Sequence, residues 1–337
     1  MPASQPTQWL ALSDHDGPIA GTGIEDIVRR ATLVLDLIPP RPGASVLLDY
    51  RSTAGWPRTL SLLYDTAGGI TLLHRQGDAA LRHHLPGPLP QHWSHARLTF
   101  HWDGPARAWC LRLEDGAGTW AQQSQGTNPM PITGEDLLAM CSGHTTARRD
   151  AAVQWFGVCQ GHPQTAPSAW IGARTPVQTP RGPVPAANLR PGDLVETLDR
   201  GAQPILSLAR MTLPNRGRFA PVLLRAPYFA NAVDLLVAPE QLILLSGAGV
   251  EYLFGEDAVL APAASLRDGN AALSDRRRSV TACIALDLGK PVLILAGGCP
   301  LLCSPDAATA VPYRLLHDYE VLPLQSLLRR GGQRNAA

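Results

Sequence analysis

The stretch WIGARTPVQTPRGPVPAANLRPGDLVETLDRGAQP, from Trp170 to Pro204, decides the fold of the second half of the chain. Within it, Pro191-Gly192-Asp193 is typical of a tight turn, because glycine tolerates a positive φ and an aspartate side chain can bond the backbone. The next four residues, 194–197, favour a strand, and Asp199-Arg200-Gly201 turns the chain back. Short strands joined by such turns predict a β-domain.

Composition divides the 337-residue chain into two domains. With 45% hydrophobic and 17% charged residues, 31 Gly and 31 Pro, the chain is typical of a folded, β-rich protein. All eight tryptophans lie at or before Trp170, and nine of the ten histidines at or before His162. Between the two compositions, GHPQTAPSA suits a linker. We therefore predict a β-sandwich over 1–160, a linker over 161–169, a second β-domain over 170–325 and a flexible tail over 326–337.

The first domain is predicted to be an antiparallel sandwich. A short helix is expected over Gly23–Arg30. It is followed by runs of five to eight residues, many with apolar residues at alternate positions and separated by turn-forming sequences. These predicted strands are ATLVLDLI, SVLLDY, TLSLLYD, GITLLHR, ARLTFHWD and AWCLRLED.

The segment Gln91–Gly116, QHWSHARLTFHWDGPARAWCLRLEDG, resembles the late strands of laminin-G and concanavalin-like jelly rolls. The resemblance extends over Ile19–Glu114. Many such sandwiches bind sugars or peptides at a loop edge, sometimes with calcium. From the residues themselves, we expect the aromatic side chains to pack in the core, namely those of Trp93, Trp102 and Trp109. No calcium site is expected from the spacing of Asp103, Glu114 and Asp115.

Two groups of residues raise the question of metal binding. The histidines His83, His84, His92 and His95 lie close in sequence, but adjacent strand residues point to opposite faces, so exposed loop histidines are expected instead of ligands. The six cysteines show no CxxC pair, which favours reduced, mostly buried thiols. Cys299 and Cys303 leave a disulfide or a metal site as the alternative. We expect neither metal nor cofactor.

The second domain resembles a bacterial Hedgehog/intein (Hint) domain. The resemblance continues through Ala220–Phe229, Asp234–Leu245, Glu251–Gly269 and Ser279–Gly298, and covers about 170–304. The opening block carries the matches Thr175, Thr179, Pro180, Gly182, Leu189, Pro191, Gly192, Asp193, Val195, Thr197, Asp199, Gly201, Gln203 and Pro204. The expected fold class is thus all-β, with an antiparallel jelly-roll-like sandwich followed by a Hint-type β-domain.

The resemblance also implies a chemistry that this sequence departs from. Hint autoprocessing uses a Cys or Ser as first residue to attack the preceding carbonyl, and a TxxH element whose His protonates the leaving nitrogen. Here Trp170 stands at the nucleophile position. Ala238 and Gln241 replace the Thr and the His, and an amide cannot exchange a proton near neutral pH. We therefore expect a catalytically inactive domain.

Three functions remain open at this stage. The first is a structural or interaction module built on a degenerate Hint domain, with an unknown protein or glycan partner. The second is self-cleavage with a non-standard nucleophile, Ser168 or Thr175, assisted by Asp193 or Glu240. The third is a carbohydrate- or peptide-binding role of the sandwich.

Charge and hydropathy argue against two classes of partner, nucleic acids and membranes. The formal net charge is +1, and the basic run Arg276–Arg278 has no interleaved aromatic residue, so no nucleic-acid partner is expected. No segment approaches the roughly 20 apolar residues of a membrane span. The first residues lack the pattern of a signal peptide, which favours a cytoplasmic protein or export by a leaderless route.

Overall fold

The computed structural model of the chain describes residues 8–15, 17–19, 23–90, 92–116, 119–142, 147–161, 169–303 and 313–325. The chain divides into two compact units, residues 1–164 (unit 1) and 165–337 (unit 2). The predicted linker falls mostly, and the predicted tail wholly, outside the described residues.

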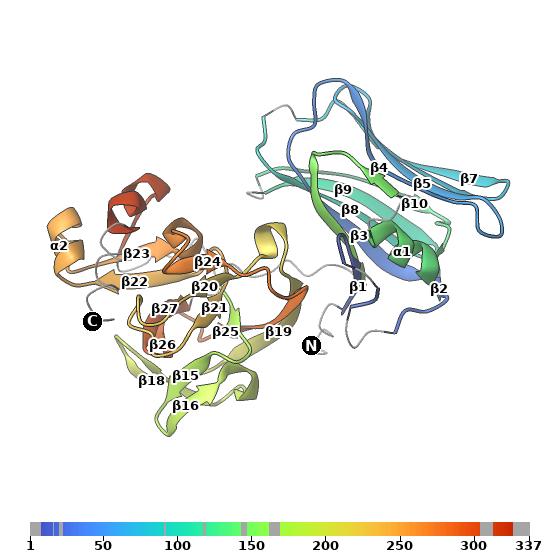
Figure 1. Cartoon of the computed structure of the whole chain (residues 1–337). Coiled ribbons are helices and arrows are strands. Elements are labelled where there is room, and N and C mark those ends of the chain that lie inside the picture. Colours follow the sequence, from blue (N-terminus) through green and yellow to red (C-terminus); the bar gives the residue numbers. More distant parts are fainter. Residues whose placement is uncertain are drawn as a thin grey trace. The chain divides into compact units, whose positions relative to one another are not determined.

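Unit 1 is a sandwich of two antiparallel sheets, and the two layers are visible in Figure 1. The first sheet has the order β1 (Gln8–Leu12), β13 (Val153–Gln160), β3 (Arg30–Leu37), β8 (Ala96–Asp103), β9 (Ala108–Asp115) and β10 (Ala121–Thr127). The second has the order β12 (Ala147–Arg149), β4 (Ala44–Ser52), β5 (Arg58–Asp65), β6 (Gly69–Gln76) and β7 (Ala79–Pro86). All six strands predicted for this unit are present.

The core of unit 1 lies between the two sheets. Along strands such as β8, buried residues alternate with less buried ones, whereas β3 and β13 are buried over most of their length. The centre of the core holds Trp102, whose indole donates to the Val28 carbonyl at 3.0 Å. Trp102 is fully buried, whereas Trp93 and Trp109 are partly buried against the same core. The expected packing role of these three tryptophans is therefore confirmed.

The helix predicted over Gly23–Arg30 is wrong. Residues 27–28 form β2 (Ile27–Val28), which pairs with β11 (Ile132–Thr133), and β3 begins at Arg30. The β-branched Ile27 and Val28 favour a strand where a partner strand is available. The helix of this unit is α1 (Gly134–Cys141), capped by Thr133, whose hydroxyl accepts from the Asp136 backbone N–H at 3.1 Å.

Unit 2 contains two further sheets around a second apolar core. One sheet has the order β19 (Ser207–Pro214), β25 (Val280–Asp287), β14 (Ile171–Gly172), β21 (Leu235–Val237), β20 (Val222–Leu224) and β24 (Ala272–Ser274). The other contains β16 (Gly182–Pro185), β15 (Pro176–Thr179), β26 (Val292–Ala296), β27 (Cys299–Cys303), β22 (Leu242–Ser246), β23 (Ala258–Pro262), β28 (Arg314–Leu315), β17 (Leu194–Thr197) and β18 (Gly201–Pro204).

Few helical residues occur in unit 2. The helix α2 (Ala248–Phe254) ends at Gly255, which has a φ of +67°, and residues 318–325 are helical. Three short 3-10 turns are η1 (Ala186–Asn188), η2 (Gly217–Phe219) and η3 (Ala263–Leu266). Strands thus dominate both units, and the all-β prediction is confirmed. In the described part of the chain, no helix has both the length and the apolar character required to cross a bilayer.

The turn that opened the sequence argument forms as predicted. Gly192 has a φ of +91°, and the Asp193 carboxylate accepts from the Arg190 backbone N–H at 2.8 Å. The strand over 194–197 is β17, and residues 198–200 return the chain into β18. Local sequence therefore determines this hairpin.

Candidate functional site

The residue matched to the nucleophile position, Trp170, lies directly before β14, a strand in the interior of its sheet. β14 pairs with β21 through Ile171 and Val237, and with β25 through Gly172 and Cys283. The side chain of Trp170 is buried, with a relative exposure of 3%. The position is therefore filled by an indole and largely closed to water.

The structure places the segment 238–241 beside Trp170. The Ala238 backbone N–H donates to the Trp170 carbonyl at 2.9 Å, and the Gln241 N–H donates to the Ala238 carbonyl at 3.1 Å. Two further backbone bonds tie the segment to η3, from Ala263 to the Gln241 carbonyl and from Ala264 to the Pro239 carbonyl. The two elements that the sequence singled out thus meet in the fold.

Gln241 occupies this position as a structural side chain. It is 2% exposed, and its amide Nε2 donates to the Leu302 carbonyl at 2.8 Å and to the Leu242 carbonyl at 3.1 Å. The bond to Leu302 connects the start of β22 with β27. An amide donates here without any change of protonation state, so Gln241 supplies hydrogen bonds and no acid–base chemistry.

Replacing Gln241 with alanine is expected to destabilise unit 2 by about 1–3 kcal/mol, because the Leu302 carbonyl loses a donor in a buried place. Urea denaturation of the whole chain, followed by far-UV circular dichroism, measures the change. Gln203→Ala is the matched control, since the Gln203 amide bonds only neighbouring carbonyls of its own exposed hairpin. Equal stability of the two variants would contradict a structural role for Gln241.

Three of the four alternative nucleophiles and acids can be placed in the structure, namely Thr175, Asp193 and Glu240. Ser168 lies outside the described residues. Thr175 is buried near the end of β14, and its backbone N–H donates to the Gly172 carbonyl at 2.9 Å. Asp193 closes its own turn in an exposed hairpin, and the Glu240 carboxylate lies 3.8 Å from the Arg218 guanidinium with its side chain 46% exposed. Both residues are exposed to solvent.

Cys283 is a residue near the site that sequence reasoning missed. It lies opposite Gly172 on β25, a placement that only the strand register shows. Burial raises the pKa of the Cys283 thiol far above its usual range, and its Sγ donates to the Thr281 carbonyl at 3.4 Å. A thiol that stays protonated is a poor nucleophile.

The other cysteines are also structural. All six thiols are free, five of them are buried, and Cys110 is half-buried. Burial raises the pKa of Cys299 and of Cys303 to about 12. The predicted reduced thiols are confirmed, and the alternative of a disulfide between Cys299 and Cys303 is wrong.

The prediction of four exposed loop histidines is correct for His92 and His95 and wrong for His83 and His84, which both lie on β7. His83 lies on β7 with its ring in the sandwich core, near the rings of Phe100 (centroids 4.8 Å apart) and Trp109 (4.6 Å). His84, one residue later, is on the opposite face and bonds the Thr71 hydroxyl at 3.0 Å. The strand alternation separates the pair as expected, but it also places one imidazole in the core.

The three acidic residues considered as calcium ligands each pair with a residue close to them in the fold. Asp103 pairs with Arg30 at 2.7 Å, Glu114 pairs with Arg112 at 2.9 Å, and Asp115 accepts from the Thr119 N–H and hydroxyl. Within the described ranges, no group of three potential ligand side chains is placed to hold a metal ion.

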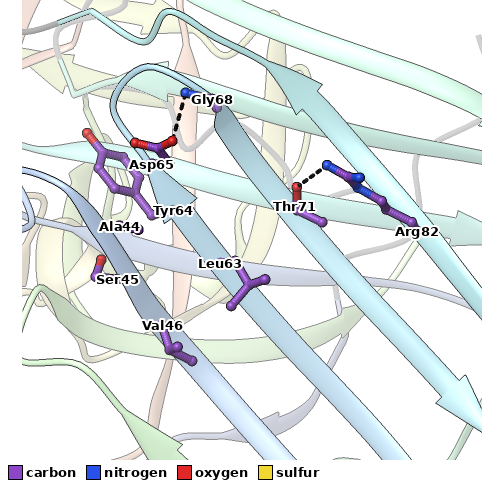
Figure 2. A pocket seen from close by; sticks show the side chains of 10 residues that line it. Ala44, Ser45, Val46, Leu63, Tyr64, Asp65, Gly68, Thr71 and Arg82 are labelled. Atoms are coloured by element: carbon purple, nitrogen blue, oxygen red, sulfur yellow. Dashed lines mark hydrogen bonds between the residues drawn. The ribbon is translucent and has the colours of Figure 1, made fainter.

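Each unit also has an open pocket at its surface. The pocket in unit 2, about 370 Å³, lies between the β15–β16 hairpin and the turn at Asp193, and Trp170 is not part of its lining. One pocket in unit 1, about 400 Å³, crosses β4 to β7 and is shown in Figure 2. There Asp65 accepts from the Gly68 N–H at 3.1 Å, and Arg82 donates to the Thr71 hydroxyl at 3.4 Å. Both bonds are local, the first within the turn between β5 and β6 and the second between the neighbouring strands β6 and β7.

Residues 172–301 match the family model described as Hint domain. No curated protein is significantly similar to the chain. The tailspike protein 2 enzymatically active domain of bacteriophage CBA120 is 12% identical over 42% of this chain and 24% of its own, with a TM-score of 0.28. The chain therefore spans about a quarter of that domain's length.

Two further solved structures are similar to the chain. The CBM40 of the Ruminococcus gnavus IT-sialidase, bound to α2,3-sialyllactose, is 12% identical over 47% of this chain and 79% of its own, with a TM-score of 0.25. The SAP-like pentraxin of Limulus polyphemus is 12% identical over 47% of this chain and 70% of its own, with a TM-score of 0.23.

Proposed function

We propose that this Hint-domain protein has lost self-processing and that its Hint domain acts as a structural or interaction module. The observation that carries the proposal is the pair of buried side chains at the matched positions, Trp170 and Gln241. An indole has no nucleophilic atom able to attack a peptide carbonyl, and a glutamine amide cannot donate a proton to the leaving nitrogen and recover it.

The surroundings of the two residues support the same proposal. Backbone hydrogen bonds link the two positions, because the Ala238 N–H donates to the Trp170 carbonyl and the Gln241 N–H donates to the Ala238 carbonyl. The Gln241 amide hydrogen-bonds β27 from the start of β22. In an active Hint domain, the histidine at this position would have to release and take up a proton. Nucleophile and acid are thus replaced by groups that fill space and hold strands, which suits a scaffold better than an enzyme.

The purified chain is expected to keep its intact mass of 36.0 kDa during prolonged incubation, with or without dithiothreitol or hydroxylamine. No thioester or ester forms without a nucleophile, so neither reagent has a bond to cleave. Intact-mass spectrometry over several days measures this directly. Ser168→Ala and Thr175→Ala serve as matched variants.

Self-cleavage through a non-standard nucleophile makes the opposite prediction. Fragments ending near residue 169, released faster with hydroxylamine and abolished by Ser168→Ala or Thr175→Ala, would establish it and overturn the proposal. Fragments that persist in both variants and disappear with protease inhibitors would instead indicate a contaminating protease.

A further inference from the structure

Trp56 is the most exposed tryptophan of unit 1. It lies in the loop between β4 and β5, and 58% of its surface is exposed, whereas Trp102 and Trp155 are fully buried. An indole combines a large flat apolar surface with a polar N–H, and leaving it in water forgoes much of the favourable burial free energy. The exposed ring is therefore available as a contact surface for a ligand.

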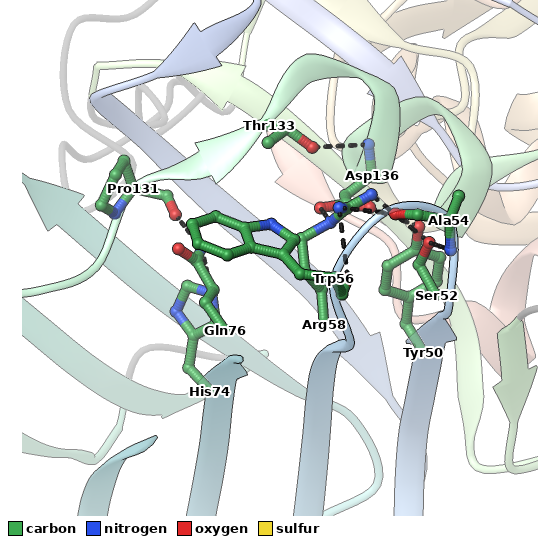
Figure 3. A network of polar contacts seen from close by, with 10 residues as sticks. All are labelled: Tyr50, Ser52, Ala54, Trp56, Arg58, His74, Gln76, Pro131, Thr133 and Asp136. Carbon is green, nitrogen blue, oxygen red and sulfur yellow. Dashed lines mark hydrogen bonds and ion pairs between the residues drawn. The ribbon is translucent and has the colours of Figure 1, made fainter. Parts of the chain in front are cut away.

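The loop that carries Trp56 is held by a single guanidinium. Arg58 donates through Nη1 to the Ala54 carbonyl at 3.0 Å and to the Trp56 carbonyl at 3.5 Å. Its Nη2 donates to the Ser52 hydroxyl at 3.3 Å, and Figure 3 shows these bonds converging from the loop onto one side chain. Backbone carbonyls on both sides of Gly55 are thereby fixed.

Arg58 is in turn fixed from α1. Its Nε donates to the Asp136 carboxylate at 2.7 Å, and the Tyr50 hydroxyl donates to the other carboxylate oxygen at 2.6 Å. The side chains of Arg58 and Asp136 are only 10% and 5% exposed. Because desolvation offsets most of the attraction in such a pair, it adds little net stability. Its clear effect here is geometric, since it aims the guanidinium at the loop.

A second hairpin tip supports the ring itself. The Gly77 N–H donates to the Pro57 carbonyl at 2.8 Å, and a Cβ built on Gly77 would lie 3.7 Å from Cε3 of Trp56. The indole thus lies beside Gly77, at a distance where a side chain would just touch it. Asp78, directly after Gly77, and Arg75, two residues before it, are both exposed, so the same hairpin tip carries charged side chains.

We propose that Trp56 is an aromatic platform for a carbohydrate ring, presented by the loop that Arg58 and Asp136 hold in place. A pyranose offers an apolar C–H face that stacks on a flat indole, while its hydroxyls bond polar side chains at the rim. A pre-formed platform loses little conformational entropy on binding, which is the advantage of fixing the loop.

The surroundings favour a sugar over a docked protein. A protein hot spot lies at the centre of a patch of other residues that exclude water. Among the described residues of unit 1, the other large exposed apolar side chains are Ile27, Val46 and Leu73, and none is in either hairpin tip. A single aromatic plane with charged neighbours suits a ligand that is apolar on one face and polar at its edge.

The test is affinity electrophoresis of the full chain in native gels containing soluble xylan, laminarin, galactomannan, pullulan or pectin. At least one polysaccharide is expected to retard the wild-type chain. Trp56→Ala is expected to weaken that retardation about thirtyfold, the effect of losing a central aromatic contact, and Trp56→Phe to retain most of it.

The matched control is Tyr252→Ala, which removes an 86% exposed aromatic side chain from unit 2 and is expected to change nothing. Thermal melting followed by circular dichroism verifies that each variant is folded. The proposal is independent of whether the Hint domain is inactive. It is overturned if none of the five polysaccharides retards the chain, or if Trp56→Ala is retarded as strongly as wild type.

Discussion

Replacing Asp136 with alanine is expected to lower the free energy of unfolding of unit 1 by about 3–5 kcal/mol. The carboxylate accepts from Arg58 at 2.7 Å and from the Tyr50 hydroxyl at 2.6 Å, and the Arg58–Asp136 pair is buried. Without Asp136, the Arg58 guanidinium would remain in the interior with no counter-charge, and the Tyr50 hydroxyl would lose its acceptor. Breaking one side of a buried pair costs far more than the intact pair contributes.

Guanidinium denaturation followed by tryptophan fluorescence measures this loss, because seven of the eight tryptophans lie in unit 1. Asp78→Ala is the control, since it removes an exposed carboxylate from a hairpin tip of the same sandwich. Its effect is expected within about 0.5 kcal/mol. A loss below about 1 kcal/mol for Asp136→Ala would show that solvent reaches the pair.

Acidification from pH 6.5 to pH 4 is expected to destabilise unit 1 through two core histidines. Burial lowers the pKa of His74 to about 4, with repulsion from His83 adding to the effect and Asp136 opposing it. Burial likewise lowers the pKa of His83 to about 4. Nδ1 of His74 and both ring nitrogens of His83 have no hydrogen-bond partner among the described residues, so the neutral rings fit an apolar surrounding.

The sign of the pH effect follows from which state binds more protons. Unfolded histidines titrate near pH 6.5, so between pH 6.5 and 4 the unfolded chain binds protons that the folded chain does not. Stability is therefore complete above pH 6.5 and falls as the pH drops through this window. Each histidine contributes a loss on the order of 2–3 kcal/mol by pH 4.

Denaturation midpoints across pH 4 to 7.5 measure this slope. The double variant His74→Leu, His83→Leu is expected to flatten it, because neither position then titrates. His84→Leu is the matched control, since His84 adjoins His83 but lies on the opposite face of β7, and it is expected to keep the wild-type slope. A wild-type stability that does not change between pH 6.5 and 4 would contradict the prediction.

Local sequence predicted much of the fold. Alternating strands such as ARLTFHWD became β8 with the expected buried face, and Pro191-Gly192-Asp193 formed its turn, because these features depend on neighbouring residues and on simple periodicity. The helix α1 had a readable signal in Thr133, three residues before Asp136, which the sequence argument passed over. The wrong helix over 23–30 arose where pairing with a distant strand prevailed over local preference.

The candidate sites depended on contacts between distant residues. Substitution of the nucleophile and the histidine is visible in the sequence alone, since Trp170 and Gln241 cannot perform that chemistry whatever surrounds them. The bond from Gln241 to Leu302, the register of Cys283 with Gly172 and the Arg58–Asp136 pair join residues 61, 111 and 78 positions apart. Side-chain identity determines which reactions are excluded, whereas only the folded chain decides which polar groups are buried together, because desolvation and hydrogen bonding depend on neighbours in space.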